Sequence, residues 1–389
     1  MKYIVTNFAY GTGPYLRTTE LAIAFNDELE KRGKPRFKVI IPFVYGKRQQ
    51  QVMREEFSEH DRRYPGELLL DAALGEMLGS MFYAKGTYEA SLSRWIKEIP
   101  AISRQIRDHL GGKFEVESLG GNKEMVHGKD IVLELNRSPR VAYGLPSYSA
   151  TFAFTGEILD QASQEPEGTF AVSRNLFLEG KKIADEIEES QKLTCLTYPA
   201  TFSYEPGYTV HHRAALIPPT LGPVQRLSGH VGIKEGIYVT VTGIPGLERL
   251  YREAHELGLT LYSNDQESVP GSVHALPQMI TRPEIKLHFA RSGWSSVWYS
   301  MFAGSPLVVP DFDPTDDPEI YFNNQAVEKL GIGIVYRGEP LFEIMKKAET
   351  VRERQKDLVV DIEKRFGTLG GTEIAARRFA DDFLRTQNV

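Results

Sequence analysis

The chain has little cysteine, no long apolar segment and no excess of basic residues. Its single cysteine, Cys195, excludes an internal disulfide, and no Cys/His group has the spacing of a zinc site. We therefore expect a reducing, cytoplasmic setting. No run reaches the roughly 18 apolar residues of a transmembrane helix, and MKYIVTNFAYGTG does not resemble a signal peptide. The sequence predicts no transmembrane segment and leaves peripheral membrane contact open.

What is present is typical of a globular protein. The 389 residues are 41% hydrophobic and 25% charged, with a formal net charge of −6. This length favours two domains. The net negative charge argues against nucleic acid as a partner, because proteins that bind it present basic faces.

The first half of the chain alternates strand and helix patterns. Residues 1–9 predict a buried strand, Thr18 or Thr19 is expected to cap the next helix, and residues 38–44 predict a second strand. A strand–helix–strand unit of this length indicates a parallel sheet. Residues 48–110 are mostly helical by pattern and are interpreted as a helical insertion.

The second half repeats the alternation after an irregular stretch at residues 196–232. Strand patterns begin at residue 236 and recur in LTLYS, KLHFA, PLVVP and GIGIVY, with helical patterns between them. Residues 339–366 and 371–386 predict two further helices. The pattern indicates two α/β units with a cleft between them.

The turn between KLHFA and the helix that follows is the most informative feature of the sequence. Ser292 and Gly293 lie in this turn. A helix start presents free backbone N–H groups and the positive end of the helix dipole, which suits a diphosphate. Side chains at the same turn add hydroxyl donors and a positive charge: Ser295, Ser296 and Arg291. A tight turn capped by serines is the alternative interpretation.

This stretch resembles the donor-binding signature of the UDP-glycosyltransferase and MurG-like superfamily, which reads W-x-P-Q, H-x-G-W-x-S, a glutamate, G-x-P and D-Q-x-x-N. The residues that match are, in chain order, Pro277, Gln278, Gly293, Trp294, Ser296, Gly304, Pro306 and Asn323. The block ending at Gly243 looks like the first strand and glycine loop of that family's C-terminal domain. The resemblance implies that these residues bind a nucleotide-sugar.

The sequence also departs from this signature. Arg291 stands at the position of the family's histidine, Tyr299 at that of its glutamate, and its D-Q pair falls on Glu319 and Ile320. A carboxylate near a sugar binds its hydroxyls, so the candidates for that role are Glu319, Asp317 and Asp316. Alternatively, these acids cap the helix that starts near Pro318.

The loop at residues 11–15 looks like the G-T-G-G-H loop of MurG-like enzymes, which assigns Thr12 and Gly13 to the acceptor side. Tyr15 stands where the family has histidine and, with a pKa near 10, is a poor base. Glu134, at the end of an apolar strand, is the other candidate base. Asn136, which follows it, is assigned to the acceptor side with Thr12 and Gly13. Burial of Glu134 against a helix is its alternative. Leu16 replaces the third glycine of a dinucleotide fingerprint, which excludes NAD.

The resemblance implies an α/β protein with two Rossmann-like domains facing a cleft, the GT-B type. The expected parts are an acceptor-binding domain at 1–228, a nucleotide-sugar-binding domain at 229–368, and a terminal helix at 369–389 returning to the first domain. We expect inverting, metal-independent transfer, without a cofactor, from a UDP-sugar to a small-molecule, lipid or glycan acceptor. A UDP-sugar 2-epimerase-like enzyme and a non-catalytic nucleotide-sugar-binding protein are the alternatives.

Overall fold

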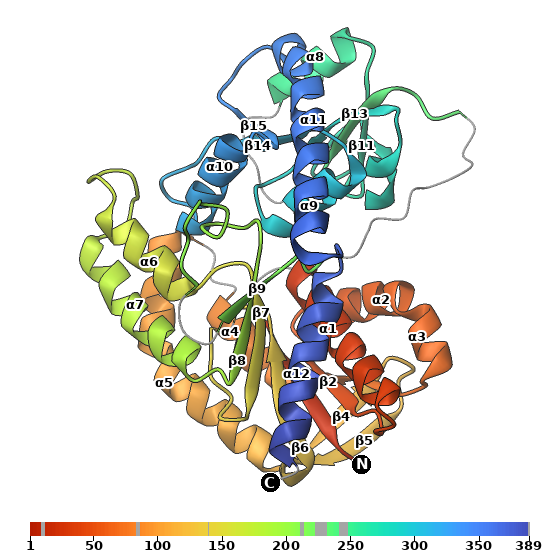
Figure 1. Ribbon diagram of the computed structural model, residues 1–389, viewed down its shortest axis with the longest axis vertical. Helices are drawn as coiled ribbons and strands as arrows, with labels where there is room; N and C mark the ends of the chain where they lie inside the picture. Colours follow the sequence, from red (N-terminus) through yellow and green to blue (C-terminus); the bar gives the residue numbers. More distant parts are fainter. Residues whose placement is uncertain are drawn as a thin grey trace. The chain divides into compact units, whose positions relative to one another are not determined.

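The computed structural model describes residues 1–8, 12–82, 86–138, 140–210, 214–221, 232–240 and 248–387. The chain forms two compact units. Unit 1 comprises Met1–Thr197, Thr209–Thr220 and Thr372–Val389, and unit 2 comprises Tyr198–Tyr208 and Leu221–Gly371. Each unit is built on a sheet with helices packed against it (Figure 1). The expected boundary at residues 228 and 229 lies outside the described residues.

Unit 1 is built on a mostly parallel sheet. Its described strands have the order β5-β4-β3-β2-β1-β6-β7-β8-β9, in which β4 pairs antiparallel with both neighbours. Their bounds are β1 (Tyr3–Asn7), β2 (Lys38–Pro42), β3 (Leu68–Asp71), β4 (Lys113–Ser118), β5 (Lys123–His127), β6 (Ile131–Asn136), β7 (Ser147–Thr151), β8 (Leu193–Thr197) and β9 (Ala214–Ile217). The strand order reverses between β1 and β6.

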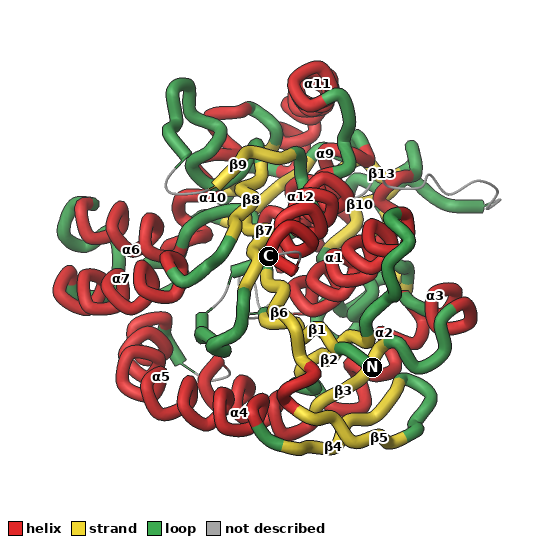
Figure 2. The backbone as a smooth tube through the Cα atoms, turned by 60° about the horizontal axis from the view of Figure 1, so that its bottom comes forward, coloured by secondary structure: helices red, strands yellow, loops and turns green. Residues whose placement is uncertain are grey.

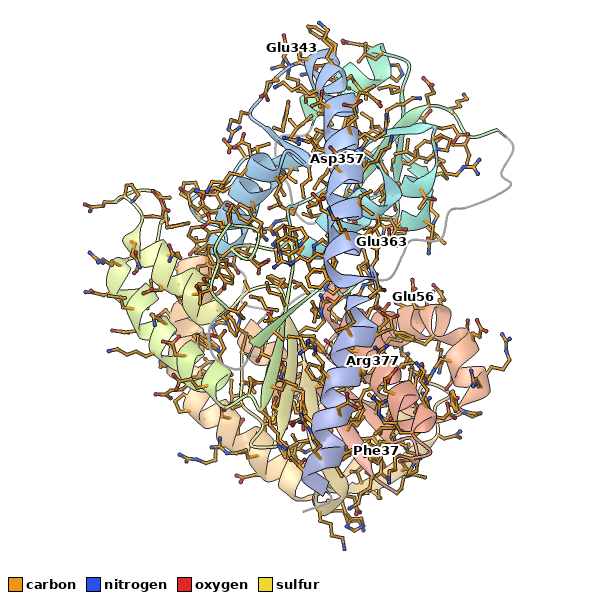
Figure 3. All side chains as sticks on the ribbon, in the orientation of Figure 1. Phe37, Glu56, Glu343, Asp357, Glu363 and Arg377 are labelled. Atoms are coloured by element: carbon orange, nitrogen blue, oxygen red, sulfur yellow. The ribbon has the colours of Figure 1, made fainter. Side chains whose placement is uncertain are left out.

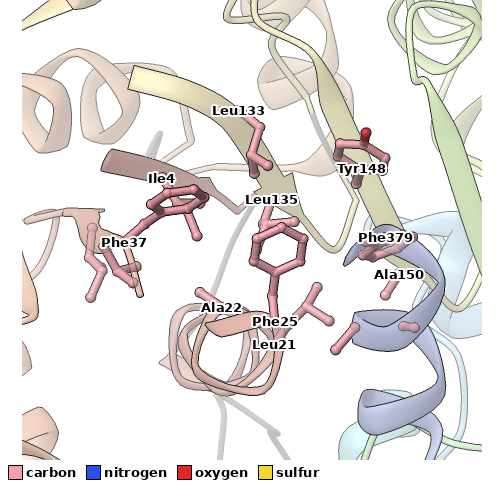
Figure 4. Close-up of a cluster of buried hydrophobic side chains, with 14 of the residues drawn as sticks. Ile4, Leu21, Ala22, Phe25, Phe37, Leu133, Leu135, Tyr148, Ala150 and Phe379 are labelled. Atoms are coloured by element: carbon pink, nitrogen blue, oxygen red, sulfur yellow. The ribbon is translucent and has the colours of Figure 1, made fainter. Parts of the chain in front are cut away.

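Helices α1 (Thr12–Lys31) and α12 (Gly371–Gln387) cover one face of this sheet, as Figures 2 and 4 show. The side chains of Phe25 on α1 and Phe379 on α12 share one buried cluster with Leu133 and Leu135 of β6. In α12 the apolar residues recur at helical spacing, which gives a continuous stripe toward the sheet. The last helix of the chain is therefore part of the core of unit 1.

The opposite face of the sheet carries another set of helices (Figure 2). They are α4 (Ala72–Phe82), α5 (Tyr88–Gly111), α6 (Thr155–Gln164) and α7 (Arg174–Glu189). The connection from β2 to β3 contains α2 (Gly46–Glu56) and α3 (Ser58–Arg63), and a 3-10 turn, η1 (Gly128–Asp130), precedes β6.

Unit 2 contains a fully parallel sheet. Its described strands have the order β12-β11-β10-β13-β14-β15. Their bounds are β10 (Gly236–Val239), β11 (Thr260–Ser263), β12 (Val273–His274), β13 (Ile285–Phe289), β14 (Leu307–Pro310) and β15 (Gly333–Tyr336). Here the order reverses between β10 and β13. Two α/β units, each with a reversal in the strand order of its sheet, confirm the expected fold class.

The helices of unit 2 are α8 (Glu248–Glu256), α9 (Trp294–Ala303), α10 (Pro318–Leu330), α11 (Leu341–Phe366) and the 3-10 turn η2 (Pro277–Thr281). Helix α11 is amphipathic. Its buried face includes Ile344 and Ile362, whereas Glu343 and Glu363 are exposed; Figure 3 labels both glutamates. No described helix is long and apolar enough to cross a membrane.

Several local predictions were wrong. Residues 48–110 are not simply a helical insertion, because Leu68–Asp71 form β3 inside the sheet. A run of three leucines has no period that separates a buried strand from a helix. Helix α1 starts at Thr12, so Thr18 and Thr19 are buried inside it and do not cap it.

Candidate functional site

Each sheet has a point where the strand order reverses, and the C-terminal edge at such a point is where open α/β sheets bind ligands. In unit 2 this point lies between β10 and β13. The loop after β13 runs from Ala290 to Gly293 and leads into α9. The loop after β10, which holds the predicted donor residue Gly243, lies outside the described residues.

The first turn of α9 has no side-chain cap, because its N-cap residue is a glycine. Gly293 is the N-cap residue, with φ −61° and ψ 132°, and no side chain caps the helix there. A Cβ atom on Gly293 would meet nothing within 4 Å. The first backward hydrogen bonds run from Ser296 and Val297 N–H to Gly293 O. The N–H groups of Trp294 and Ser295 therefore precede the helical hydrogen bonds, as at an anion-binding helix start.

The serines of the turn have different environments. Ser295 and Ser296 are half-buried on the first turn of α9. Ser292 is fully buried, and its hydroxyl donates to Ile320 O of α10 over 3.4 Å. The Ser292 side chain therefore ties the turn to α10, and only its backbone belongs to the open face.

Arg291 is paired with an acid from the loop after β14. Its guanidinium donates to the carboxylate of Asp316, and both side chains are about one-third exposed. The second oxygen of Asp316 accepts from Asp317 N over 2.8 Å. Asp316 thus connects the turn before α9 with the turn before α10, and its carboxylate is occupied by these contacts.

Trp294 and Asn323 match the signature but are both buried. The indole Nε1 donates to Asn323 Oδ1 over 2.8 Å and to Thr201 Oγ1 over 3.0 Å, and Thr201 Oγ1 also donates to Asn323 Oδ1. These side chains form hydrogen bonds with one another within unit 2. These hydrogen bonds fix α9 against α10 and the 198–208 segment, and the predicted contact of Trp294 and Asn323 with the donor stays a prediction.

The acids at the start of α10 also have separate roles. Asp317 is the N-cap, and its carboxylate accepts from Glu319 N over 2.9 Å, as the alternative interpretation expects. Glu319 is half-buried and accepts from Asn323 Nδ2 over 3.2 Å. Of the three carboxylates predicted to bind a sugar, Asp316 and Asp317 make hydrogen bonds that hold the turn before α10.

Pro277 and Gln278 lie on η2, close along the chain to β12 at the edge of the sheet. Both are half-buried. The side-chain Oε1 of Gln278 is buried and has no hydrogen-bond partner in the part of the chain that the structure describes. An acceptor atom left unpaired inside a protein is costly, so it marks a position where a ligand donor would be stabilising.

In unit 1 the reversal point lies between β1 and β6. The acceptor-side loop residues predicted here start α1: Thr12 begins the helix, and a Cβ on Gly13 would meet nothing within 4 Å. Tyr15 is 1% exposed and packs against Phe8 and Tyr45 at ring distances of 6.0 and 5.6 Å. Burial raises its pKa to about 12, so its environment opposes a role as base.

Glu134 is likewise buried, on the face of β6 opposite to Leu133. Its Oε1 accepts from Asn7 Nδ2 over 2.7 Å and from Asn136 Nδ2 over 3.2 Å. Burial raises its pKa to about 7, and hydrogen bonds from these amides oppose the shift only in part. The side chains that donate to this carboxylate include the amides of Asn7 and Asn136. Asn7 Nδ2 also donates to Val141 O, so this network holds the loop after β6.

Two features of unit 1 were not predicted from the sequence. His109 Nε2 and Asp71 Oδ2 are 2.7 Å apart, although 38 positions separate them, and no local pattern announces such a pair. Arg137 follows β6 directly and is buried. A charged residue placed right after an apolar strand was the available signal for Arg137. Among the described residues no group of three or more His, Cys, Asp or Glu is arranged to hold a metal.

Comparison with known proteins supports the fold from a different direction. No protein-family model matches the chain, and no curated protein matches it. Solved structures do match over nearly its whole length. A glycotransferase of kitacinnamycin has a TM-score of 0.57 at 14% identity, covering 99% of this chain and 98% of its own.

Two plant proteins give the same result. A UDP-glucosyltransferase from Polygonum tinctorium, capable of glucosylating indoxyl, has a TM-score of 0.58 at 11% identity. Medicago truncatula UGT71G1, solved with UDP-glucose, has a TM-score of 0.57 at 12% identity. In both cases 98% of each chain is covered. At such low identity the likeness shows the fold, and it confirms the expected GT-B type of two Rossmann-like domains.

Proposed function

We propose that this chain, which has the fold of UDP-glycosyltransferases, transfers a sugar from a nucleoside diphosphate sugar to a hydroxyl group of an acceptor. The observation that carries the proposal is the open start of α9 at the reversal point of the unit 2 sheet. UDP-sugar is the expected donor, because two of the matched structures are described with UDP-glucose or as a UDP-glucosyltransferase.

The diphosphate is proposed to bind at the first turn of α9. The N–H groups of Trp294 and Ser295 and the hydroxyls of Ser295 and Ser296 are donors for its oxygens. Gly293 leaves room for close approach. When the sugar leaves, negative charge grows on the diphosphate, and fixed donors at a helix start stabilise that charge without rearranging. Arg291 adds a permanent positive charge at the same turn.

The nucleoside and sugar are assigned to the two sides of this turn. Gln278, with its unpaired Oε1, is proposed to accept a hydrogen bond from the base or ribose. Glu319 is proposed to bind sugar hydroxyls, because it is half-buried and lies one turn from Asn323 on α10. Its carboxylate would exchange the 3.2 Å contact with Asn323 for charge-assisted hydrogen bonds to the sugar.

Unit 1 is proposed to bind the acceptor, at the reversal point between β1 and β6. We include inversion at the anomeric carbon and independence of metal ions in the proposal. Glu134 stays the candidate base because its pKa of about 7 suits proton abstraction. Its 1% exposure means that the loop after β6 has to move before an acceptor reaches it.

A screen of nucleotide-sugars tests the proposal. UDP-, GDP-, ADP- and dTDP-sugars are compared by thermal shift, since a ligand that binds the native state raises its melting temperature. We expect the UDP-sugars to give the largest shift. Transfer is then measured with a panel of hydroxylated acceptors, with EDTA in a parallel reaction, and the anomeric configuration of the product is read by NMR. Failure of all four nucleotide classes to shift the melting temperature would contradict the proposal.

A non-catalytic nucleotide-sugar-binding protein is the second candidate. The burial of both predicted acid–base residues, Tyr15 and Glu134, favours it. Binding of a UDP-sugar without transfer or hydrolysis in the acceptor panel would support this candidate. Incubation with the donor alone also tests the epimerase alternative, because only an epimerase would convert the donor into its C2 epimer.

A further inference from the structure

Arg137 occupies the ligand-binding position of the unit 1 sheet. It follows the last residue of β6, at the C-terminal edge where the strand order reverses between β1 and β6. The residue is 6% exposed. In the described part of the chain its guanidinium makes one hydrogen bond, from Nη2 to Thr220 Oγ1 over 2.6 Å, and its buried Nε–H has no partner.

Among the residues whose side chains are described, this guanidinium has no carboxylate partner. No Asp or Glu oxygen of the described residues forms a salt bridge with Arg137. The residues outside the described ranges include no Asp or Glu, and Glu248, the one acid whose side chain is not described, belongs to unit 2. The nearest charges that act on it are Arg17 and Glu20, and those two side chains pair with each other on α1. Burial, helped by Arg17, lowers the pKa of Arg137 to about 10.

Another shielded arginine of unit 1 shows what a structural guanidinium looks like in this protein. The side chain of Arg36 is 11% exposed and forms salt bridges with Asp27, Glu30 and Glu67. Burial alone would lower its pKa, but Glu67 and Asp27 outweigh burial and raise it. Burying a charge without such partners is strongly unfavourable. Arg137 bears this cost at the one edge of the sheet where a ligand is expected.

Other polar atoms at this edge are also left unpaired. Asn7 is the last residue of β1, Asn136 the last of β6, and Ser149 is the register partner of Asn136 on β7. The atoms Asn7 Oδ1, Asn136 Oδ1 and Ser149 Oγ are buried and have no hydrogen-bond partner among the described residues. Buried polar groups normally have partners, so these exceptions at one register position of the sheet edge indicate a place where a ligand binds. The two amide oxygens can only accept, so they suit a hydroxyl of the ligand, whereas Arg137 supplies donors for an oxyanion.

We propose that Arg137 binds an oxyanion, either a carboxylate or a phosphate, carried by the acceptor substrate. The inference rests on the proposed function for its assignment to the acceptor. A guanidinium binds such groups through parallel N–H···O bonds, and its unpaired Nε–H is one of the donors required. Bound there, the oxyanion compensates a buried charge that no described side chain compensates. The acceptor is therefore an anionic molecule that also bears the hydroxyl to be glycosylated.

The test uses phenyl phosphate and benzoate as oxyanion probes, and benzyl alcohol as their neutral counterpart. Binding is measured by isothermal titration calorimetry on the full chain saturated with UDP, so that the diphosphate site of unit 2 is filled. We expect at least one oxyanion probe to bind, benzyl alcohol not to bind, and Arg137→Gln to weaken the probe at least about tenfold, the scale of one charge-assisted contact. The better probe identifies the phosphate or the carboxylate as the natural group.

Two further variants separate binding from folding. Arg137→Lys keeps the charge and should retain part of the probe affinity. Thr220→Val removes only the partner of Nη2 and should leave the affinity within about threefold. Arg137→Gln should melt at the same or a higher temperature than the parent, because it removes an uncompensated buried charge. A lowered melting temperature with unchanged probe affinity would overturn the proposal, as would absence of probe binding to the parent at millimolar concentration.

The result can be separated from that of the proposed function. UDP affinity should be the same in Arg137→Gln and in the parent. Loss of UDP binding without loss of probe binding would place Arg137 on the donor and overturn the proposal. If UDP fails to bind the parent but the probe binds through Arg137, the oxyanion site stands and the proposed function falls. That comparison is made with the same titrations in the absence of UDP.

Discussion

Trp294 Nε1 donates a hydrogen bond to Asn323 Oδ1 over 2.8 Å, and both side chains are buried. The two residues come from the start of α9 and from α10, and they are the tryptophan and the final asparagine of the matched signature. Their contact fixes the turn at Ser292 and Gly293 against α10. We therefore expect Trp294 and Asn323 to stabilise the turn, and the backbone of the turn to contact the ligand.

The first prediction concerns this contact. Trp294→Phe removes the indole donor and leaves Asn323 Oδ1 with one donor fewer, so we expect the free energy of unfolding to fall by about 1–3 kcal/mol. Urea unfolding measures it, and Asn323→Leu with the double variant completes a cycle that should show coupling. An Asn323→Leu variant of unchanged stability that loses UDP affinity would instead mean that Asn323 contacts the donor.

The second prediction concerns Arg291. Arg291→Ala should weaken UDP binding about ten- to hundredfold if its guanidinium contacts phosphate. The matched control is Asp316→Ala, which breaks the same ion pair but keeps the positive charge. We expect this control to keep the parent's UDP affinity or to exceed it. Equal losses in the two variants, measured by calorimetry, would show that the pair only orders the loop.

The third prediction follows from the pKa of Glu134. Burial raises it to about 7, above the ordinary value of 4.5, so the folded state keeps a proton that the unfolded state releases. The contribution of Glu134 to stability is therefore largest below pH 4.5, falls as the pH rises toward 7, and levels off above it. The total loss over this window is on the order of 3 kcal/mol.

Glu134→Gln should remove this part of the pH dependence. The free energy of unfolding is measured at about pH 5, 6, 7 and 8. It should fall less steeply with rising pH in the variant than in the parent. Glu188, whose pKa is also raised to about 7 by burial, supplies a remaining slope of the same sign. Identical slopes for parent and variant would contradict the assigned shift.

The fourth prediction concerns α12. Phe379 is fully buried in the cluster formed with α1 and the unit 1 sheet. Phe379→Ala should lower the free energy of unfolding by about 3–5 kcal/mol, the usual cost of such a core truncation. Arg377→Ala, an exposed change on the same helix (Figure 3), is the matched control and should change it by less than about 0.5 kcal/mol. Equal effects of the two changes would show that α12 does not belong to the core.

How far the sequence leads depends on how local each feature is. The turn at Ser292 and Gly293 could be predicted because the strand, the glycine and the helix that make it are contiguous. Strand β3 was mistaken for helix because Leu68, Leu69 and Leu70 carry no period. The start of α1 was misplaced because Thr18 and Thr19 favour a helix cap by type, but their burial inside the helix is decided by the sheet.

The features that the sequence did not reveal are contacts between distant positions. The pairing of Arg291 with Asp316, the amides around Glu134 and the isolation of Arg137 depend on which loops meet at a sheet edge. The partners of a buried carboxylate decide whether its pKa lies near 4 or near 7. Residue type alone does not contain that information.

The central claim is that the open start of α9 binds the diphosphate of a UDP-sugar, and a charge placed at Gly293 tests it most directly. Gly293→Asp has space for its side chain and a backbone conformation that suits any residue, and aspartate is a favourable N-cap. Its stability should equal or exceed that of the parent. Gly293→Asn is the matched control of nearly the same shape without the charge.

The decisive measurement is the UDP affinity of the parent, Gly293→Asn and Gly293→Asp by isothermal titration calorimetry. A carboxylate at the helix start occupies its N–H groups and repels the diphosphate. We predict that Gly293→Asp binds UDP at least about a hundredfold more weakly than the parent and clearly more weakly than Gly293→Asn. A folded Gly293→Asp variant with the parent's UDP affinity would contradict the account.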